Sequence, residues 1–146
     1  LSEEEAASRM IDLIKEIANY CREKGDKSFY VIPQNGEGLL KYDSSFLDVV
    51  SGWAAEDLFY NGTEPWQGDD LRWLEEERYP YLNEVVSKGK PVFSVDYVDD
   101  GSGYSGANKE RIDDYREKAL GRGFIPYAAR SDRELGDLNI IEGVQP

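Results

Sequence analysis

Two carboxylates follow short apolar segments and have the setting that acid–base chemistry needs. Residues 49–55 lead into Glu56, and residues 91–95 lead into Asp96. A carboxylate that leaves a buried segment at a cleft has a raised pKa when it is partly desolvated, as a general acid requires. Glycoside hydrolysis uses two such groups on opposite sides of the bond. The alternative for either acid is a helix cap or an arginine partner. Asp57 adjoins Glu56 but should point to the other side of an extended chain.

Neutral polar and aromatic residues stand near the same positions. Gln34 and Asn35 follow the apolar residues 29–32 and offer hydrogen bonds to sugar hydroxyls and amines. The alternative is a plain turn, because Asn-Gly is typical turn chemistry. Aromatic residues also crowd the loops after the two acid-bearing segments: Tyr60, Trp66, Tyr97 and Tyr104. Aromatic faces at the mouth of a site suit sugar rings or a cation, and their alternative role is to anchor loops.

The elements that must position these residues alternate between strand and helix. Strands are predicted over residues 29–32, 49–55, 91–97 and 124–126. Helices are predicted over residues 2–25, 69–89 and 108–121, with Pro80 kinking or splitting the second. This alternation is typical of an α/β fold with parallel strands and right-handed crossovers. The carboxyl ends of parallel strands share one face of the sheet, where sites are built, so the polar residues above should converge.

The helical spacing also predicts which side chains are buried. The first helix should bury one face, made of Met10, Leu13, Ile14, Ile17 and Cys21. The last should turn Ile112, Tyr115, Ala119 and Leu120 inward, with Asn108 as its cap.

Composition narrows the class of protein. The 146 residues, 40% apolar and 32% charged, suit a single soluble domain. The net charge of −13 repels phosphate backbones and anionic lipid, so we expect neither a nucleic-acid partner nor a lipid surface. A cationic substrate would be attracted, although an acidic surface also serves solubility alone. No apolar run has the length of a membrane span, so we expect no membrane insertion.

Few features of the sequence indicate a cofactor or a metal site. The chain has no histidine, which excludes histidine-based triads and histidine-ligated zinc, and its one cysteine, Cys21, fits a buried structural thiol. Residues 101–106 match the dinucleotide motif G-x-G-x-x-G, but Asp99 and Asp100 directly before it would repel a pyrophosphate. An EF-hand is rejected because Val98 stands where a second ligand should be. We therefore expect no cofactor and no metal.

Four segments together resemble a known family. They read VIPQNG at residues 31–36, EDLFY at 56–60, VFSVDY at 92–97 and GFIPYA at 123–128. In this order and spacing they resemble the endo-α-1,4-polygalactosaminidase family, glycoside hydrolase family 114, over nearly the whole chain.

The resemblance implies a (β/α)8 barrel of which this chain is the second half, from the helix after strand four to strand eight. Of the two catalytic carboxylates of the family, that of strand six corresponds to Glu56, and that of strand four would precede Leu1. We expect residues 1–146 to form one half-barrel-like domain, a fragment of a larger glycosidase domain. A half barrel leaves sheet edges open, so its expected partner is the missing N-terminal half or a second copy of itself.

The resulting prediction is a secreted or surface glycoside hydrolase acting on an α-1,4-linked galactosamine-type polysaccharide. Glu56 is the predicted general acid/base, and this chain alone should be inactive. The predicted substrate-binding residues are Gln34, Asn35, Asp96, Tyr97, Tyr60 and Trp66. A non-catalytic carbohydrate-binding or assembly module is the alternative, and a barrel fragment with another small-molecule substrate is a third. The linkage, and whether the reaction retains or inverts the anomeric centre, stay open.

Overall fold

A parallel sheet of three strands organises the chain in the computed structural model, which describes all residues from 1 to 146. The strands are β1 (Trp53–Glu56), β4 (Val92–Asp99) and β5 (Ile125–Arg130), in the spatial order β1-β4-β5. Trp53 pairs with Val92, and Phe93 pairs with Ile125. The strands form an open sheet, and the chain builds no closed barrel. The predicted α/β class with parallel strands is confirmed.

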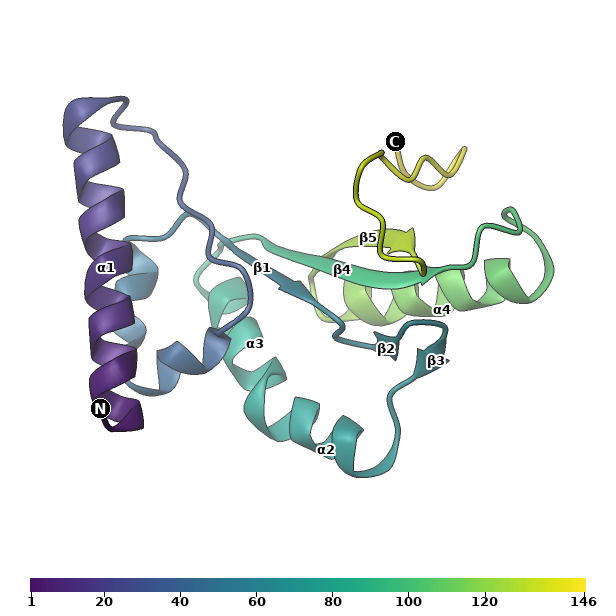
Figure 1. Cartoon of the computed structure of the whole chain (residues 1–146), viewed down its shortest axis with the longest axis horizontal. Coiled ribbons are helices and arrows are strands. Elements are labelled where there is room, and N and C mark those ends of the chain that lie inside the picture. Colours follow the sequence, from purple (N-terminus) through teal and green to yellow (C-terminus); the bar gives the residue numbers. More distant parts are fainter.

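Helices and one short hairpin complete the architecture (Figure 1). The α-helices are α1 (Glu3–Lys24), α2 (Gly68–Glu77), α3 (Tyr79–Ser87) and α4 (Gly106–Gly121). Two short 3-10 helices, Glu37–Lys41 and Ser44–Asp48, connect α1 to the sheet, and β2 (Tyr60–Asn61) pairs with β3 (Glu64–Pro65) after β1. In Figure 1, α3 and α4 lie on one side of the sheet, while α1 stands at its far end.

The predicted strand over residues 29–32 is wrong. This segment is extended, but its ladder to β1 is reduced to one bridge, between Gln34 and Ala54. Pro33 lacks an N–H group and accepts from Ala54 instead. The segment therefore lies beside β1 as an edge, and it still brings Gln34 and Asn35 to the end of that strand.

The other strand boundaries move toward the carboxyl side. The second strand begins at Trp53, because a 3-10 helix occupies residues 44–48. The strand that contains Asp96 continues to Asp99, with a register shift against β5 between these two residues. The expectation that Asp96 leaves its strand is therefore wrong, since apolar residues 97–98 carry the strand on.

The predicted break at Pro80 is confirmed. α2 ends at Glu77 and α3 begins at Tyr79, with Pro80 in its first turn. Arg78 stands alone at the junction with φ −122° and ψ −55°. Because the helix axis changes there, Arg78 leaves the solvent face and turns toward the sheet.

The predicted buried face of α1 is wrong in this chain. Met10, Leu13 and Ile17 are 48%, 48% and 46% exposed, whereas the buried residues are Ala7, Ile11 and Ala18. The capping box of Ser2 and Glu5 is present, so the start of the helix is as predicted. α1 therefore presents an apolar stripe to solvent and packs through Ala7, Ile11 and Ala18, with Ile14 partly buried against the core. Cys21, on the same helix, is half-buried.

The last helix follows the prediction except at two positions. Ile112, Tyr115 and Ala119 are buried, but Leu120 is 57% exposed. Asn108 is not the cap, because α4 begins at Gly106 and Asn108 lies buried within its first turn.

One apolar core lies between the sheet and the helices. It joins 22 buried residues, among them Trp53, Phe59, Tyr115 and Phe124. The other face of the sheet is open: Phe93 and Val95 are half-buried, and Ile125 is exposed. None of the helices combines the length and the apolar character that crossing a membrane would take.

Candidate active site

Glu56, the last residue of β1, lies at the centre of a hydrogen-bonded cluster. Its Oε1 accepts a bond from Asn35 Nδ2 at 3.1 Å, and its Oε2 accepts one from the Tyr97 hydroxyl at 2.7 Å. Asn35 comes from the segment beside β1, and Tyr97 from β4. The expected convergence of these three polar residues at the carboxyl ends of the strands is therefore confirmed.

Asn35 is fixed in place by several contacts. Its φ of 54° is in the left-handed region, which asparagine tolerates better than most residues. Its Oδ1 accepts from the Glu56 backbone N–H at 3.1 Å, and its carbonyl accepts from Trp53 Nε1 at 3.2 Å. Both ends of the Asn35 amide therefore bind Glu56, one at the backbone and one at the carboxylate. This geometry favours a positioning role, and direct substrate binding by Asn35 stays a prediction.

A buried ion pair next to this cluster was not predicted from the sequence. Arg78 pairs with Glu37, and their side chains are 13% and 2% exposed. Arg78 also donates to the carbonyl of Glu56 at 3.0 Å and to Asn35 Oδ1 at 3.2 Å. Glu37 Oε2 is buried without a hydrogen bond. The available signal was the position of Arg78, two residues before Pro80, where a helix break turns a side chain inward.

Tyr97 is held as a hydrogen-bond donor. Burial, together with its bond to Glu56, raises the pKa of Tyr97 to about 12, so the hydroxyl keeps its proton through the neutral range. The Arg133 guanidinium lies 4.1 Å from the centre of the Tyr97 ring and makes two bonds to Asp57, at 2.9 and 3.1 Å. Asp57 thus pairs with an arginine rather than with Glu56.

Asp96 lies inside the protein, beneath the loop that follows β1. It is 0% exposed, and its carboxylate accepts the backbone N–H groups of Leu58, Phe59 and Tyr60 at 3.0, 2.7 and 2.9 Å. Burial raises its pKa to about 6, although the three N–H groups act to lower it. Its expected place at the open mouth beside Glu56 is wrong. The geometry favours a carboxylate that shapes the loop carrying Asp57.

The remaining predicted substrate-binding residues differ in their exposure and in their hydrogen bonds within the chain. Gln34 is exposed, and its side chain forms no hydrogen bond within the chain. Tyr60 is buried, and its hydroxyl donates to Asp114 at 2.5 Å. Trp66 is half-buried, donates from Nε1 to the Asp57 carbonyl at 3.0 Å, and lines a cavity of about 170 Å³. The contacts of Tyr60 and Trp66 favour anchoring of the hairpin, and their substrate-binding roles stay predictions.

The three carboxylates of this cluster differ in their partners. Asp57 is engaged by Arg133 and Asp96 by three amides, whereas Glu56 is held by one neutral amide and one phenol. Glu56 is therefore the carboxylate of the cluster that has neither an arginine partner nor a set of backbone donors. No three histidine, cysteine, aspartate or glutamate side chains lie close enough together to hold a metal ion.

Comparison with known proteins gives the family. Residues 3–144 match the protein family described as "Glycoside-hydrolase family GH114". An uncharacterized protein of Thermotoga maritima is 49% identical over 147 residues, covering 100% of this chain and 44% of that protein. One of Methanocaldococcus jannaschii is 48% identical over 139 residues, covering 94% of this chain and 39% of that protein. The chain thus spans about two fifths of the length of these relatives. It belongs to glycoside-hydrolase family GH114.

Proposed function

We propose that the protein to which this chain belongs hydrolyses an α-1,4-linked galactosamine-type polysaccharide, with Glu56 as general acid/base. The observation that supports this role is the setting of Glu56. Its carboxylate stands at a strand end and is oriented by Asn35 and Tyr97 without a cationic partner. Family membership supports a carbohydrate substrate. A general acid/base contributes about 10²- to 10⁴-fold to such a reaction.

The second carboxylate is proposed to come from outside these 146 residues. Glycoside hydrolysis needs two carboxyl groups, and the other two acids of the cluster are already engaged. The relatives extend well beyond the matched region, which leaves room for the other half of a barrel. The apolar stripe of α1 and the open face of the sheet are the surfaces that this half, or a second copy, would cover.

The charge supports a cationic polymer as the substrate. A net charge of −13 attracts amines at long range and raises the local concentration of a polycation. A galactosamine polymer carries one ammonium group on each deacetylated residue. Such polymers lie outside cells, so we propose an extracellular or cell-surface location.

The test is the variant Glu56→Gln in the full-length protein, assayed on a deacetylated α-1,4-galactosamine polymer. We expect kcat to fall at least about a hundredfold, because the amide cannot transfer the proton. Glu117→Gln, an exposed α4 residue without a hydrogen bond or ion pair, is the matched control. Turnover of Glu56→Gln within a factor of a few of the wild type would overturn the role of Glu56.

A non-catalytic carbohydrate-binding module is the second candidate. It is favoured by one observation: Asp57 is bound by Arg133 and Asp96 by three backbone amides, so Glu56 is the one acid of the cluster that only neutral side chains hold. The discriminating experiment compares the full-length protein with residues 1–146 on the same polymer. Hydrolysis by the first and binding alone by the second would assign catalysis to the complete protein. Binding without hydrolysis by both would favour the module.

A further inference from the structure

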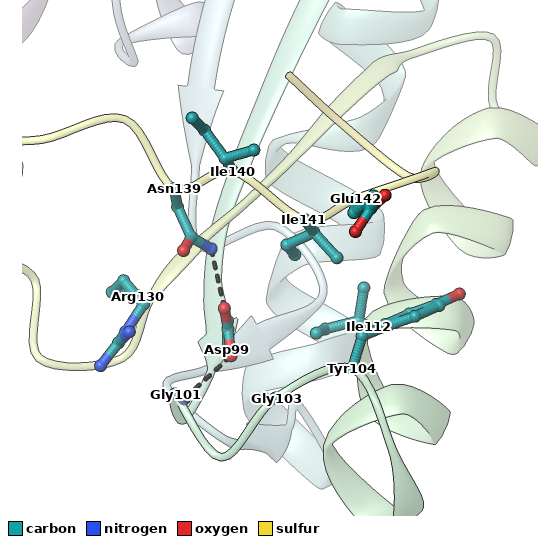
Figure 2. A pocket seen from close by; sticks show the side chains of 10 residues that line it. All are labelled: Asp99, Gly101, Gly103, Tyr104, Ile112, Arg130, Asn139, Ile140, Ile141 and Glu142. Carbon is teal, nitrogen blue, oxygen red and sulfur yellow. Dashed lines mark hydrogen bonds between the residues drawn. The ribbon is translucent and has the colours of Figure 1, made fainter.

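One cavity of the chain lies away from Glu56, at the carboxyl ends of β4 and β5. It has a volume of about 480 Å³, within the range of small-molecule sites. Figure 2 shows its walls, which come from the strand ends, the glycine-rich loop after β4 and the chain after residue 138. Three charged side chains line it: Asp99, Arg130 and Glu142.

Arg130 enters this cavity with its hydrogen-bonding capacity unused. Its guanidinium forms no hydrogen bond within residues 1–146, and its Nε is buried without a partner. The side chain is 43% exposed and forms a loose ion pair with Asp132, at 3.8 Å from Nη2. The guanidinium lies against Gly101, where a Cβ would come within 2.2 Å of Nη2. Only glycine fits there, also because its φ is +81°. The backbone thus makes room for a guanidinium that receives no hydrogen-bond acceptor from residues 1–146.

The neighbouring carboxylate is already saturated. Asp99 accepts from the Gly101 N–H at 2.9 Å, from Asn108 Nδ2 at 2.8 Å and from Asn139 Nδ2 at 2.9 Å. Burial acts to raise the pKa of Asp99, but the bonds from Asn108 and Asn139 outweigh it and lower the pKa. Asp99 therefore stays anionic and balances part of the Arg130 charge at a distance, without taking up its N–H groups (Figure 2).

Glu142 supplies a second unpaired charge on the cavity wall. Its side chain is exposed, accepts no hydrogen bond and forms no ion pair. Tyr104, also on the wall, is 38% exposed; its hydroxyl donates to Asp113, and Lys109 Nζ lies 4.8 Å from the centre of its ring. The cavity thus combines free guanidinium donors, a free carboxylate and an aromatic surface.

We propose that this cavity binds one amino-sugar residue of the substrate chain, remote from the residue that is cleaved. Arg130 donates to ring hydroxyls, Glu142 pairs with the ammonium group, and Tyr104 contacts the apolar face of the ring. This rests on the proposed function above. Phosphate ligands are disfavoured, since Asp99, Asp100 and Glu142 would repel them.

The position of the cavity fits an elongated substrate. β4 separates β5 from β1, so the two strands are roughly 10 Å apart across the sheet. Glu56 pairs with Val95 and Arg130 with Asp99, so Arg130 also lies about four residues, roughly 13 Å, further along the strand direction. One turn connects the two places: the Arg133 N–H donates to the Arg130 carbonyl, and Arg133 then reaches Asp57 beside Glu56. An oligosaccharide of a few residues spans this distance along the site face of the sheet.

The experiment measures binding of two probes to the full-length protein carrying Glu56→Gln, which prevents cleavage. The probes are an α-1,4-galactosamine pentasaccharide and its fully N-acetylated form, titrated by calorimetry. Glu142→Gln should weaken the amine probe about tenfold and leave the acetylated probe unchanged, because only the amine is charged. Arg130→Met should weaken both about tenfold. Glu110→Gln, exposed and unpaired on α4, is the matched control.

Each contrary outcome separates the subsite from the proposed function. Unchanged affinities in both pocket variants, or equal weakening of both probes by Glu142→Gln, would overturn the subsite. Loss of polymer hydrolysis in Glu56→Gln together with unchanged pocket affinities would leave the proposed function standing. Probe-specific weakening without any hydrolysis by the wild type would support the subsite and overturn the function. Glu142 is exposed, so its variant should keep the wild-type thermal unfolding, which is checked in parallel.

Discussion

The two strand-end regions of this sheet treat their charged side chains in opposite ways. Around Glu56, Arg78 bonds to Glu37, to Asn35 and to the Glu56 backbone, and both carboxylate oxygens of Glu56 have donors. Around Arg130, a guanidinium has no hydrogen bond and a carboxylate has no partner. A network of hydrogen bonds holds Glu56 in one geometry, although one atom of that network, Glu37 Oε2, has no partner. Charged groups without hydrogen bonds remain able to bind a ligand.

This difference indicates that the two regions have different roles at the same edge of the sheet. The Glu56 region has the rigidity that proton transfer needs, because its supporting residues are themselves held. The Arg130 region has the free donors and acceptors that recognition needs. Single substitutions of these charged and polar groups should therefore change stability or activity to different degrees. We expect the largest change to be a loss of stability in the Glu56 region.

The largest expected effect is a difference in stability between the variants of Arg78 and Arg130. Arg78→Met leaves Glu37 buried without a partner, so we expect the free energy of unfolding to fall by about 3–5 kcal/mol. Arg130→Met should change it by less than about 1 kcal/mol, because no hydrogen bond is lost. Urea unfolding followed by tryptophan fluorescence measures both. Arg72→Met, at an exposed ion pair, is the control, and equal losses for Arg78 and Arg130 would erase the contrast.

The next effect is a pH dependence in the Glu56 region. Asp96 has a folded pKa of about 6 against an ordinary value of 3.8, so the folded state holds its proton more tightly than the unfolded state. Its contribution to stability is therefore greatest below about pH 4 and is lost as the pH rises through 6. We expect a loss of up to about 3 kcal/mol.

The comparison of wild type with Asp96→Asn isolates this carboxylate. Urea unfolding between about pH 4 and pH 7 should show the loss in the wild type and not in the variant. Asp43 and Asp100 have pKa values lowered to about 2, so their contributions change at lower pH and with the opposite sign. Parallel pH profiles of the two proteins would contradict a raised pKa for Asp96.

A smaller effect concerns the orientation of Glu56. Tyr97→Phe removes the 2.7 Å bond to Oε2 while keeping the ring under Arg133. We expect kcat of the full-length protein to fall about tenfold and stability by about 1 kcal/mol. Tyr20→Phe, whose hydroxyl is exposed and unbonded, is the control. Unchanged kcat would mean that Asn35 alone orients the carboxylate.

The smallest effect on stability should come from Gln34. Because its side chain is exposed and unbonded, Gln34→Ala should leave the free energy of unfolding within about 0.5 kcal/mol of the wild type. If Gln34 binds substrate, as the sequence predicts, KM should rise severalfold at constant kcat. Steady-state kinetics on the polymer decide this, and an unchanged KM would remove Gln34 from the site.

The sequence predicted what depends on local chemistry. Strand–helix alternation gave the parallel α/β class, Pro80 gave the helix break, and strand-end polarity brought Asn35, Glu56 and Tyr97 together. Helical periodicity found an apolar stripe on α1 but could not tell what covers it, and the stripe is exposed.

What the sequence could not predict depends on contacts between distant residues. Arg78 and Glu37 are 41 positions apart, and the helix break near Arg78 does not indicate which acid it pairs with. Asp96 was placed at a strand end because the apolar run before it is short. Pairing of β4 with β5 extends the strand and buries the carboxylate.

The three amides on Asp96 have a consequence for the order of folding. They join the loop at residues 58–60 to a strand residue 36 to 38 positions later in the chain. Closing a loop of that length costs entropy before any contact compensates it, so the loop cannot become ordered until β4 has docked on β1. Glu56 therefore gains its final surroundings late, and hydrogen exchange at Leu58, Phe59 and Tyr60 should report the opening of the sheet itself.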